Sequence, residues 1–234
     1  MPSPTSPAID LTGRVALVTG GSRGLGRAMA FGLAGAGAQV VVASRNGEHC
    51  EATAAEITAA TGIPAWGLAA HVGHWAALDG LVETVYDRLG RVDILINNAG
   101  MSPVYDAVTD VTEELFDKVV AVNLKGPFRL SALVGTRMVA AGGGSIVNVS
   151  SICGQLGTPW MAGYSAAKAA VDNLSRAAAA EGAPQGIRVN VVIPAVVETP
   201  ATAGMLATEE SSKATEKLIP MGRVGQPEDL ANAI

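Results

Sequence analysis

The chain has 234 residues, 49% of them hydrophobic, and its 16 Lys and Arg against 21 Asp and Glu give a formal net charge of −5. This length and composition support one sizeable hydrophobic core. The negative charge, without a basic block or stripe, argues against nucleic acid as a partner.

The start of the chain has neither the charged nor the apolar region of a signal peptide, and no apolar run is long enough to span a bilayer. We therefore expect a cytoplasmic protein that does not bind membranes. Cys50 and Cys153 are far apart, and the three histidines form no cluster with the spacing of metal ligands. These features argue against a disulfide framework and against a metal site.

Predicted strands and helices alternate along the chain. The Pro- and Ser-rich start predicts a disordered tail over residues 1–10, and residues 11–234 are expected to form a single domain. Val- and Ile-rich runs, typical of parallel strands buried on both faces, lie at residues 14–19, 39–44, 64–70, 92–97, 145–150 and 187–193. Helical periodicity is found at residues 27–36, 48–60 and 76–89. This alternation predicts an α/β fold with a doubly wound, mostly parallel sheet.

The first predicted strand is followed by TGGSRGLG, in which Gly20, Gly24 and Gly26 have the spacing G-x-x-x-G-x-G. Glycine permits a tight turn, and the N-terminus of the next helix offers free N–H groups to a pyrophosphate. Gly-rich turns after strands are common, so an ordinary loop stays an open alternative. The position in the first strand–helix unit favours a dinucleotide site.

The second predicted strand ends in Ser44 and Arg45, without an acidic residue. An NAD site usually has a carboxylate here for the ribose 2′-hydroxyl, whereas Arg suits a 2′-phosphate. Arg23, in the glycine turn, adds a second positive charge. Two solvated surface arginines are the alternative. The pattern favours NADP(H) over NAD(H).

Tyr164 and Lys168 stand one helical turn apart in YSAAK, with only small residues between them. Residues at i and i+4 share a helix face, and a nearby ammonium stabilises a phenolate. Since an unperturbed phenol has a pKa of ~10, a lowered pKa is needed for proton transfer near neutral pH. The small residues leave room for a cofactor against the same face. An isolated pair of this kind is more often a surface contact, so the neighbouring motifs decide.

Together these motifs resemble the single-domain branch of the short-chain dehydrogenase/reductase family. They follow the family's order from about residue 11 to the end of the chain: TGGSRGLG, NNAG at residues 97–100, Asn123 in VNLKG, Ser151 after IVNVS, YSAAK and IPAVVETP. The resemblance implies that Tyr164 is the acid/base and that Lys168 lowers its pKa. It also implies that Ser151 holds the substrate oxygen and that Asn123 anchors a proton-relay water. Ser151, and not its neighbour Ser150, has the family's spacing to Tyr164.

The resemblance also implies a set of cofactor contacts along the ends of the predicted strands. They are Gly20, Ser22, Arg23, Gly24, Leu25, Gly26, Ser44, Arg45, His71, Val72, Asn98, Ala99, Gly100, Tyr164, Lys168, Pro194, Val197 and Thr199. His71 departs from the family, in which Asp or Asn commonly precedes the hydrophobic residue that contacts adenine. Ala195 replaces the Gly of the family's Pro-Gly loop and would cost about 1 kcal/mol if its φ were positive.

The sequence therefore predicts an NADP(H)-dependent oxidoreductase that moves a hydride between nicotinamide and the carbon of a carbonyl or secondary alcohol. Five residues are expected near the substrate: Met101, Pro103, Val104, Trp160 and Met161. They suggest a small, uncharged and fairly apolar substrate, although each also suits a packed core. The open alternative is a catalytically weak nucleotide-binding or interaction protein.

Pro227, Glu228 and Asp229 predict the first turn of a helix, and the sequence ends at Ile234. Relatives continue through one more strand, so the last family strand is expected to be missing. Residues after about Pro227 are expected to be poorly ordered, or packed only through Leu230 and Ile234.

Two long helices, around residues 115–139 and 161–180, are expected to form the interface of a homodimer or homotetramer. This interface does not involve the last family strand. It is therefore expected to persist without it.

Overall fold

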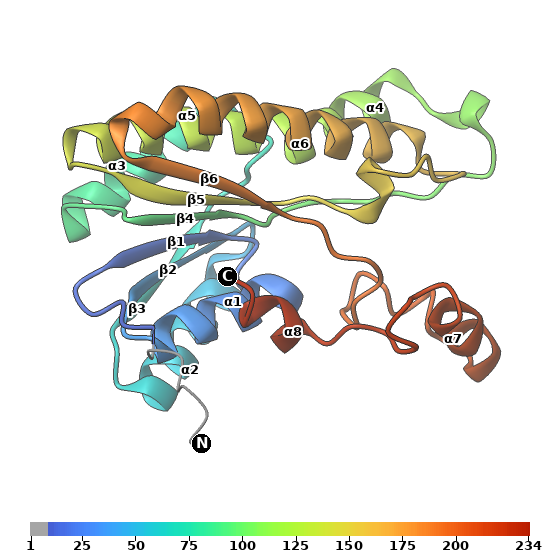
Figure 1. Cartoon of the computed structure of the whole chain (residues 1–234), viewed down its shortest axis with the longest axis horizontal. Coiled ribbons are helices and arrows are strands. Elements are labelled where there is room, and N and C mark those ends of the chain that lie inside the picture. Colours follow the sequence, from blue (N-terminus) through green and yellow to red (C-terminus); the bar gives the residue numbers. More distant parts are fainter. Residues whose placement is uncertain (1–8) are drawn as a thin grey trace, which may run out of the picture.

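The computed structural model describes residues 9–234, which build a parallel sheet of six strands covered by helices on both faces (Figure 1). The strands are β1 (Val15–Thr19), β2 (Gln39–Ser44), β3 (Ala65–Ala69), β4 (Ile94–Asn97), β5 (Gly144–Val149) and β6 (Ile187–Val192). Their order is β3-β2-β1-β4-β5-β6, and all neighbours are parallel. This is the doubly wound order of the Rossmann fold, so the predicted fold class is confirmed. The disordered tail predicted over residues 1–10 lies outside the described residues except for Ile9 and Asp10.

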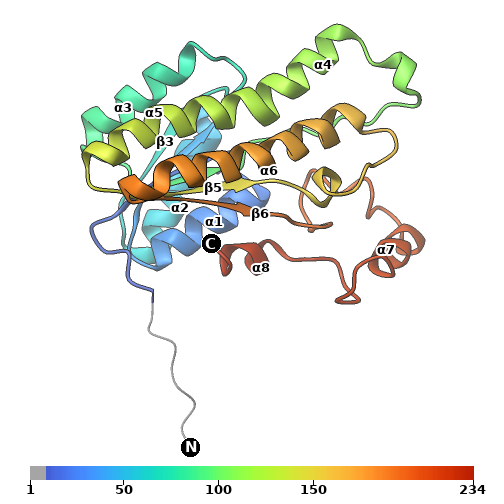
Figure 2. The same cartoon turned by 45° about the horizontal axis from the view of Figure 1, so that its top comes forward.

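The helices connect the strands and cover the sheet in two layers. The α-helices are α1 (Gly24–Gly35), α2 (Gly47–Thr61), α3 (Ala77–Leu89), α4 (Glu113–Val120), α5 (Gly126–Ala140), α6 (Ala162–Gly182), α7 (Glu209–Glu216) and α8 (Pro227–Ala231). Short 3₁₀ turns are η1 (Val108–Asp110), η3 (Ile152–Gly154) and η4 (Ala183–Gln185). Helices α3 to α6 lie over one face and α1, α2 and α8 over the other, while α7 lies beyond the end of β6 (Figure 1 and Figure 2).

The strands bury side chains on both faces because both faces are covered. In β1, Leu17 belongs to the core cluster that contains Leu130 and Met138 of α5. The next residue, Val18, belongs to the opposite cluster with Met29 of α1. This two-sided burial explains the near-continuous Val and Ile runs in the sequence.

The predicted strand boundaries agree with the structure to within two residues. The largest difference is at β4, which begins at Ile94 rather than at residue 92. There the Asp93 carboxylate accepts hydrogen bonds from the Val15 backbone N–H at 2.9 Å and from Arg14 and Arg91. These contacts tie together the amino ends of β1 and β4.

The helix predicted around residues 115–139 is continuous but contains a π-helical turn. Helix α4 passes through this turn, η2 (Ala121–Lys125), into α5. A π turn widens the helix locally and is frequent at functional sites. The turn contains Asn123, one of the predicted catalytic residues.

The end of the chain packs against helix α1, in the layer that also contains α2 (Figure 1). Leu230 is buried, and Ile234 packs against the core cluster that contains Met29. Ala231 lies next to Gly32 of α1, where an added Cβ would be 3.5 Å from the Ala231 side chain. Of the two expected alternatives, the end packed through Leu230 and Ile234 is the one found, and Ala231 adds a third contact.

Candidate active site

The candidate site residues lie at the carboxyl ends of the strands, where β1 is flanked by β2 on one side and β4 on the other. At this switch point the connections from β1 and β4 run to opposite faces of the sheet, which opens a crevice in doubly wound folds. Gly20 follows β1, Asn98 follows β4, and Ser151 lies just after β5.

Asn98 holds the glycine turn in place. Its backbone N–H donates to Thr19 Oγ1 at 3.0 Å, and its side-chain Nδ2 donates to the carbonyls of Thr19 at 2.9 Å and Gly20 at 3.2 Å. Gly20 has a φ of 64°, and a Cβ there would lie 2.8 Å from Asn98 Nδ2. A Cβ on Gly26 would collide with the Gly20 carbonyl. The turn therefore requires glycine at both positions.

The N-terminus of α1 is available to an anion. Arg23 is its N-cap in extended conformation, forms no side-chain capping bond, and no acidic residue lies in the first turn. The N–H groups of Gly24, Leu25 and Gly26 therefore have no partner within the helix. Gly24 also faces Thr199, since a Cβ on Gly24 would be 3.4 Å from the Thr199 side chain. This set of donors fits a pyrophosphate group.

The end of β2 carries hydroxyl and guanidinium groups. Ser44 Oγ lies 2.9 Å from Ser22 Oγ and 3.0 Å from Cys50 Sγ. Arg23 and Arg45 are exposed. Within residues 9–234, neither guanidinium has a hydrogen-bond or salt-bridge partner. This chemistry fits a phosphate on the adenosine ribose.

Two predicted contacts follow β3. Val72 is buried and belongs to the main core cluster. His71 is half-buried and, together with Arg45, lines a cavity of about 470 Å³. Both residues thus lie just after the end of β3.

Asn123 is fully buried in the π turn. Its Nδ2 donates to the carbonyls of Met101 at 2.8 Å and Val119 at 3.0 Å, and its Oδ1 accepts the Met101 N–H at 3.2 Å. A Cβ on Gly100 would lie 3.0 Å from Asn123 Oδ1 and 3.7 Å from Lys168 Nζ. Gly100 therefore leaves room beside it for both the Asn123 amide and the Lys168 ammonium.

Lys168 is a buried cation with only 4% of its surface exposed. Its Nζ donates to the Val149 carbonyl at 2.8 Å and lies 5.7 Å from the ring centroid of Tyr164. Burial lowers the pKa of Lys168 to about 8, and the carboxylate of Asp172 opposes this shift. Close to pH 8 a substantial fraction of this side chain is neutral.

Tyr164 and Ser151 lie together at the start of α6 and the end of β5. Burial raises the pKa of Tyr164, the Ser151 hydroxyl opposes this shift, and Cys153 adds to it. The lowered pKa predicted from the sequence is therefore wrong for the protein alone. The physical reason is that burial outweighs the hydroxyl, while the Lys168 ammonium is bonded to the Val149 carbonyl.

The loop after β6 also approaches this region. The Pro194 carbonyl accepts the N–H of Ile152, which joins the loop to the turn after Ser151. Val197 is buried, and the Ala195 backbone does not have a positive φ. The replacement of glycine by Ala195 thus causes no backbone strain.

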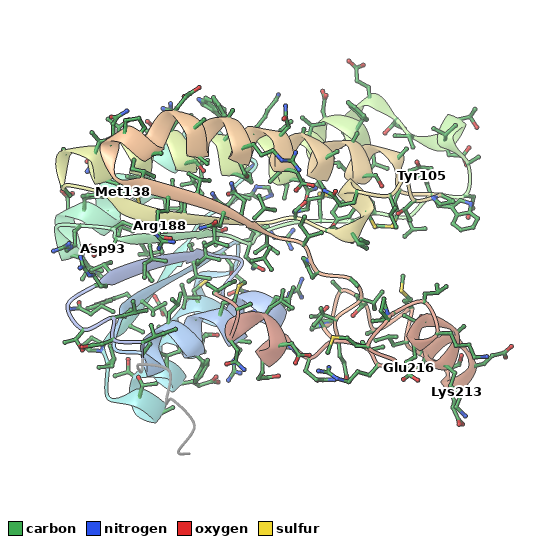
Figure 3. The ribbon with its side chains drawn as sticks, in the orientation of Figure 1. Asp93, Tyr105, Met138, Arg188, Lys213 and Glu216 are labelled. Atoms are coloured by element: carbon green, nitrogen blue, oxygen red, sulfur yellow. The ribbon has the colours of Figure 1, made fainter. Side chains whose placement is uncertain are left out.

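Tyr105, which the sequence analysis missed, supports the start of α6. Its hydroxyl accepts the Ala162 N–H at 2.7 Å, and its backbone N–H donates to the Trp160 carbonyl at 3.3 Å. Figure 3 shows Tyr105 on the loop beyond the carboxyl ends of the strands, at the opposite end of the sheet from Asp93. A single tyrosine in a loop has no spacing pattern that would have identified this role.

The expected substrate residues have different surroundings. Pro103 lines a narrow crevice with Tyr164, Leu115 and Phe116, whereas Met101 packs against the core. Val104 and Trp160 are exposed, and Met161 precedes α6. Trp160 has a φ of 61°, which is uncommon for a bulky side chain.

No helix in residues 9–234 is long and apolar enough to cross a bilayer. The same part of the chain contains no group of three His, Cys, Asp or Glu side chains arranged to hold a metal ion.

The glycine turn at a helix N-terminus, at the switch point of a Rossmann sheet, is typical of dinucleotide-dependent enzymes. Comparison with known proteins agrees. Residues 14–210 match the family model for short chain dehydrogenase. The chain is 35% identical over 234 residues to the 3-oxoacyl-(acyl-carrier-protein) reductase FabG of Aquifex aeolicus (strain VF5), covering 97% of this chain and 90% of that protein.

Solved structures are similarly close. A candidate short-chain alcohol dehydrogenase from Sinorhizobium meliloti 1021 matches with a TM-score of 0.92 and 39% identity, over 97% of this chain and 89% of that one. A gluconate 5-dehydrogenase from Burkholderia cenocepacia J2315, in complex with NADP and tartrate, matches with a TM-score of 0.91 and 33% identity, over 97% and 88%. The chain therefore belongs to the short-chain dehydrogenase family of oxidoreductases, which act on CH–OH and C=O groups with nicotinamide cofactors.

Proposed function

We propose that this protein is an NADP(H)-dependent oxidoreductase that interconverts a carbonyl and a secondary alcohol, with Tyr164 as the general acid/base. The observation that carries the proposal is the arrangement around Gly100. Asn123 and the buried Lys168 both lie beside this glycine, and Tyr164 lies on the same helix as Lys168. The unpaired N–H groups of α1 are the matching anion site.

When bound, the nicotinamide supplies or accepts the hydride. In the reducing direction Tyr164 donates its proton to the carbonyl oxygen, and in the oxidising direction it takes the proton from the hydroxyl. Ser151 donates a hydrogen bond to the same oxygen. Burial raises the pKa of Tyr164 in the protein alone, so the lowering that proton transfer needs would come from the positive charge of a bound, oxidised nicotinamide.

Lys168 and Asn123 support this proton transfer. The ammonium has three donors, one of which is used by the Val149 carbonyl. The amide oxygen of Asn123 accepts one hydrogen bond, from Met101, and retains a second acceptor position. We infer that this position holds the water that passes protons between Lys168 and solvent.

The coenzyme preference follows from the end of β2. Ser44 and two unpaired guanidinium groups, of Arg23 and Arg45, suit the dianionic 2′-phosphate of NADP(H). A carboxylate for the 2′-hydroxyl of NAD(H) is absent from this strand end. The NADP complex of the related gluconate 5-dehydrogenase is consistent with this preference.

We further propose a small, uncharged substrate. The side chains next to Tyr164 that line a narrow crevice are mostly apolar, among them Pro103, Leu115 and Phe116, and none of them is charged. The substrates named for the relatives differ, from 3-oxoacyl-(acyl-carrier-protein) to gluconate. Because both relatives are named as enzymes, the comparison does not favour the alternative of a catalytically weak binding protein.

The test is turnover of NADPH with a panel of ketones, quinones, sugars and acyl thioesters. The expected result is oxidation of NADPH that depends on one of the uncharged carbonyl compounds. Binding of NADPH without turnover of any compound would instead favour the nucleotide-binding alternative.

A further inference from the structure

His71 occupies the strand end next to the proposed 2′-phosphate site. In this fold the residue at the end of β2 meets the adenosine ribose. The purine base, attached to that ribose, therefore reaches the neighbouring strand end, which is that of β3 in the order β3-β2-β1. His71 follows β3, and Arg45 follows β2.

The cavity between these strand ends and helix α3 has the size and lining of a base site. Its volume is about 470 Å³, and Leu68, Ala70 and Leu81 give it apolar walls. Arg45 and His71 contribute the hydrogen-bond donors of the lining. Thr84, the remaining polar side chain of the lining, uses its hydroxyl hydrogen on the Gly80 carbonyl at 2.7 Å.

The tautomer of His71 is determined by its neighbour. The Gly73 backbone N–H donates to His71 Nδ1 at 3.1 Å, so the lone pair of Nδ1 is occupied. In a neutral imidazole the ring hydrogen is then on Nε2, which makes Nε2 a donor. Nε2 has no hydrogen-bond partner in the part of the chain that the structure describes.

The surroundings keep the ring neutral. Burial lowers the pKa of His71, interactions with His74, Arg45 and Lys118 lower it further, and its backbone hydrogen bond opposes this shift. His74 stacks on His71 with ring centroids 4.3 Å apart. At neutral pH, His71 therefore presents one N–H donor and no acceptor.

We propose that His71 selects the purine base of the coenzyme through this donor, so that the protein accepts a hypoxanthine dinucleotide at least as well as NADP(H). The inference rests on the proposed coenzyme function.

The reason is the difference between the two base edges. Adenine has an amino group at C6, which is a donor and opposes the Nε2–H of His71. Adenine can bond to this group only through its ring nitrogens. Hypoxanthine has an oxygen at C6, which accepts from Nε2–H directly. A carboxylate at this position would reverse the preference, because it accepts from the adenine amino group and repels the oxygen.

The experiment compares the dissociation constants of NADPH and of its hypoxanthine analogue by calorimetry, for the unmutated protein and for His71→Asp. The two ligands share their phosphates, riboses and nicotinamide. The unmutated protein is expected to bind the analogue at least as tightly as NADPH. His71→Asp is expected to weaken the analogue relative to NADPH by about tenfold. His71→Asn is the second variant if His71→Asp does not fold: its amide can accept from the adenine amino group as well as donate to the hypoxanthine oxygen, so it is expected to shift the ratio toward NADPH, by less than His71→Asp.

The control is His74→Asp. It introduces the same negative charge at the neighbouring position, and His74 does not line the cavity. It is expected to change both constants by the same factor. An unchanged ratio in His71→Asp and His71→Asn, or discrimination against the analogue by the unmutated protein, would overturn this inference alone. Failure to bind either ligand would overturn the proposed coenzyme function as well.

Discussion

Lys168 is a buried ammonium, and the carboxylate of Asp172 raises its pKa against the effect of burial. Its pKa is about 8 in the folded protein, against an ordinary value of 10.5. Between these values the folded protein binds fewer protons than the unfolded chain, so the free energy of unfolding from this group rises with pH. Below pH 8 the buried side chain is charged, and the full unfavourable free energy of burying this charge lowers the stability of the fold. Such a loss of stability is typical of a functional residue.

The substitution Asp172→Asn removes the charge that opposes the lowering of the Lys168 pKa. The pKa of Lys168 should then fall below about 8. Because the proposed mechanism needs the ammonium, kcat/KM should decline at a lower pH than in the unmutated protein. The measurement is the pH profile of kcat/KM, with the exposed Asp87→Asn as a control. Superimposable alkaline limbs in all three proteins would contradict the role of Lys168.

The coenzyme preference is also decided by single residues. Arg45→Ala is expected to reduce the preference for NADPH over NADH about tenfold, because one charge-assisted bond to phosphate is worth about 1.5 kcal/mol. The double substitution Ser44→Asp with Arg45→Ile should reverse the preference, since a carboxylate repels the 2′-phosphate. Dissociation constants at moderate salt provide the measurement. Equal dissociation constants for NADPH and NADH in the unmutated protein would show that Arg23 and Arg45 are solvated surface residues without a role in coenzyme preference.

The sequence predicted some properties of the candidate site residues and not others. Spacing separated Ser151 from Ser150, and in the structure Ser150 donates its hydroxyl hydrogen to the Lys168 carbonyl. The direction of the Tyr164 pKa could not be predicted, since it depends on how deeply α6 and β5 bury the ring. The roles of the cofactor and catalytic residues remain predictions.

Helix α6 positions Tyr164 and Lys168, and its first turn is supported from outside. Met161 at its N-cap provides no side-chain capping bond, and Tyr105 accepts the Ala162 N–H instead. Such support comes from a residue far away in the sequence, so local capping patterns could not reveal it.

Tyr105→Phe is expected to lower the free energy of unfolding by about 1 kcal/mol, the usual cost of losing a capping acceptor. Hydrogen exchange at the start of α6 should become faster, because the Ala162 N–H loses its acceptor. Thermal unfolding and exchange measured by mass spectrometry test this. Unchanged exchange in this segment would show that Tyr105 does not support the helix.

A buried polar network joins the elements below the site. Asn97 of β4 donates to Asn148 of β5 at 2.8 Å, and Asn148 donates to Ser175 of α6 at 2.8 Å. The sequence motif NNAG identified the position but not this network. Only the register of β4 against β5, in which Asn97 pairs with Asn148, brings the two amides together.

At the scale of the whole molecule, the fold was the most predictable feature. Runs such as QVVVAS, all apolar but for their ends, occur only where both faces of a strand are covered. The position of the last helix was less predictable, because α8 has few apolar residues and its packing depends on the space beside Gly32 of α1. The single-domain organisation and the cytoplasmic location remain predictions.

The long helices are expected to form the interface between copies of the chain. Phe128 and Val139 of α5 are exposed, and α6 exposes a face of small residues that includes Ala169 and Ala177. Ala177→Arg should convert a dimer or tetramer into monomers, because a long charged side chain prevents close helix contact. Light scattering after size exclusion measures the mass, and Ala59→Arg on the exposed surface of α2 is the matched control. A monomeric unmutated protein would refute the interface.

The proposed proton transfer is tested most directly by Tyr164→Phe, which removes only the phenolic oxygen. Calorimetry should give a dissociation constant for NADPH close to that of the unmutated protein, because the ring keeps its packing. The turnover number should fall by about a thousandfold at every pH, within the range typical of lost acid–base catalysis. Turnover equal to that of the unmutated protein across the pH range would contradict the assignment of Tyr164 as the acid/base.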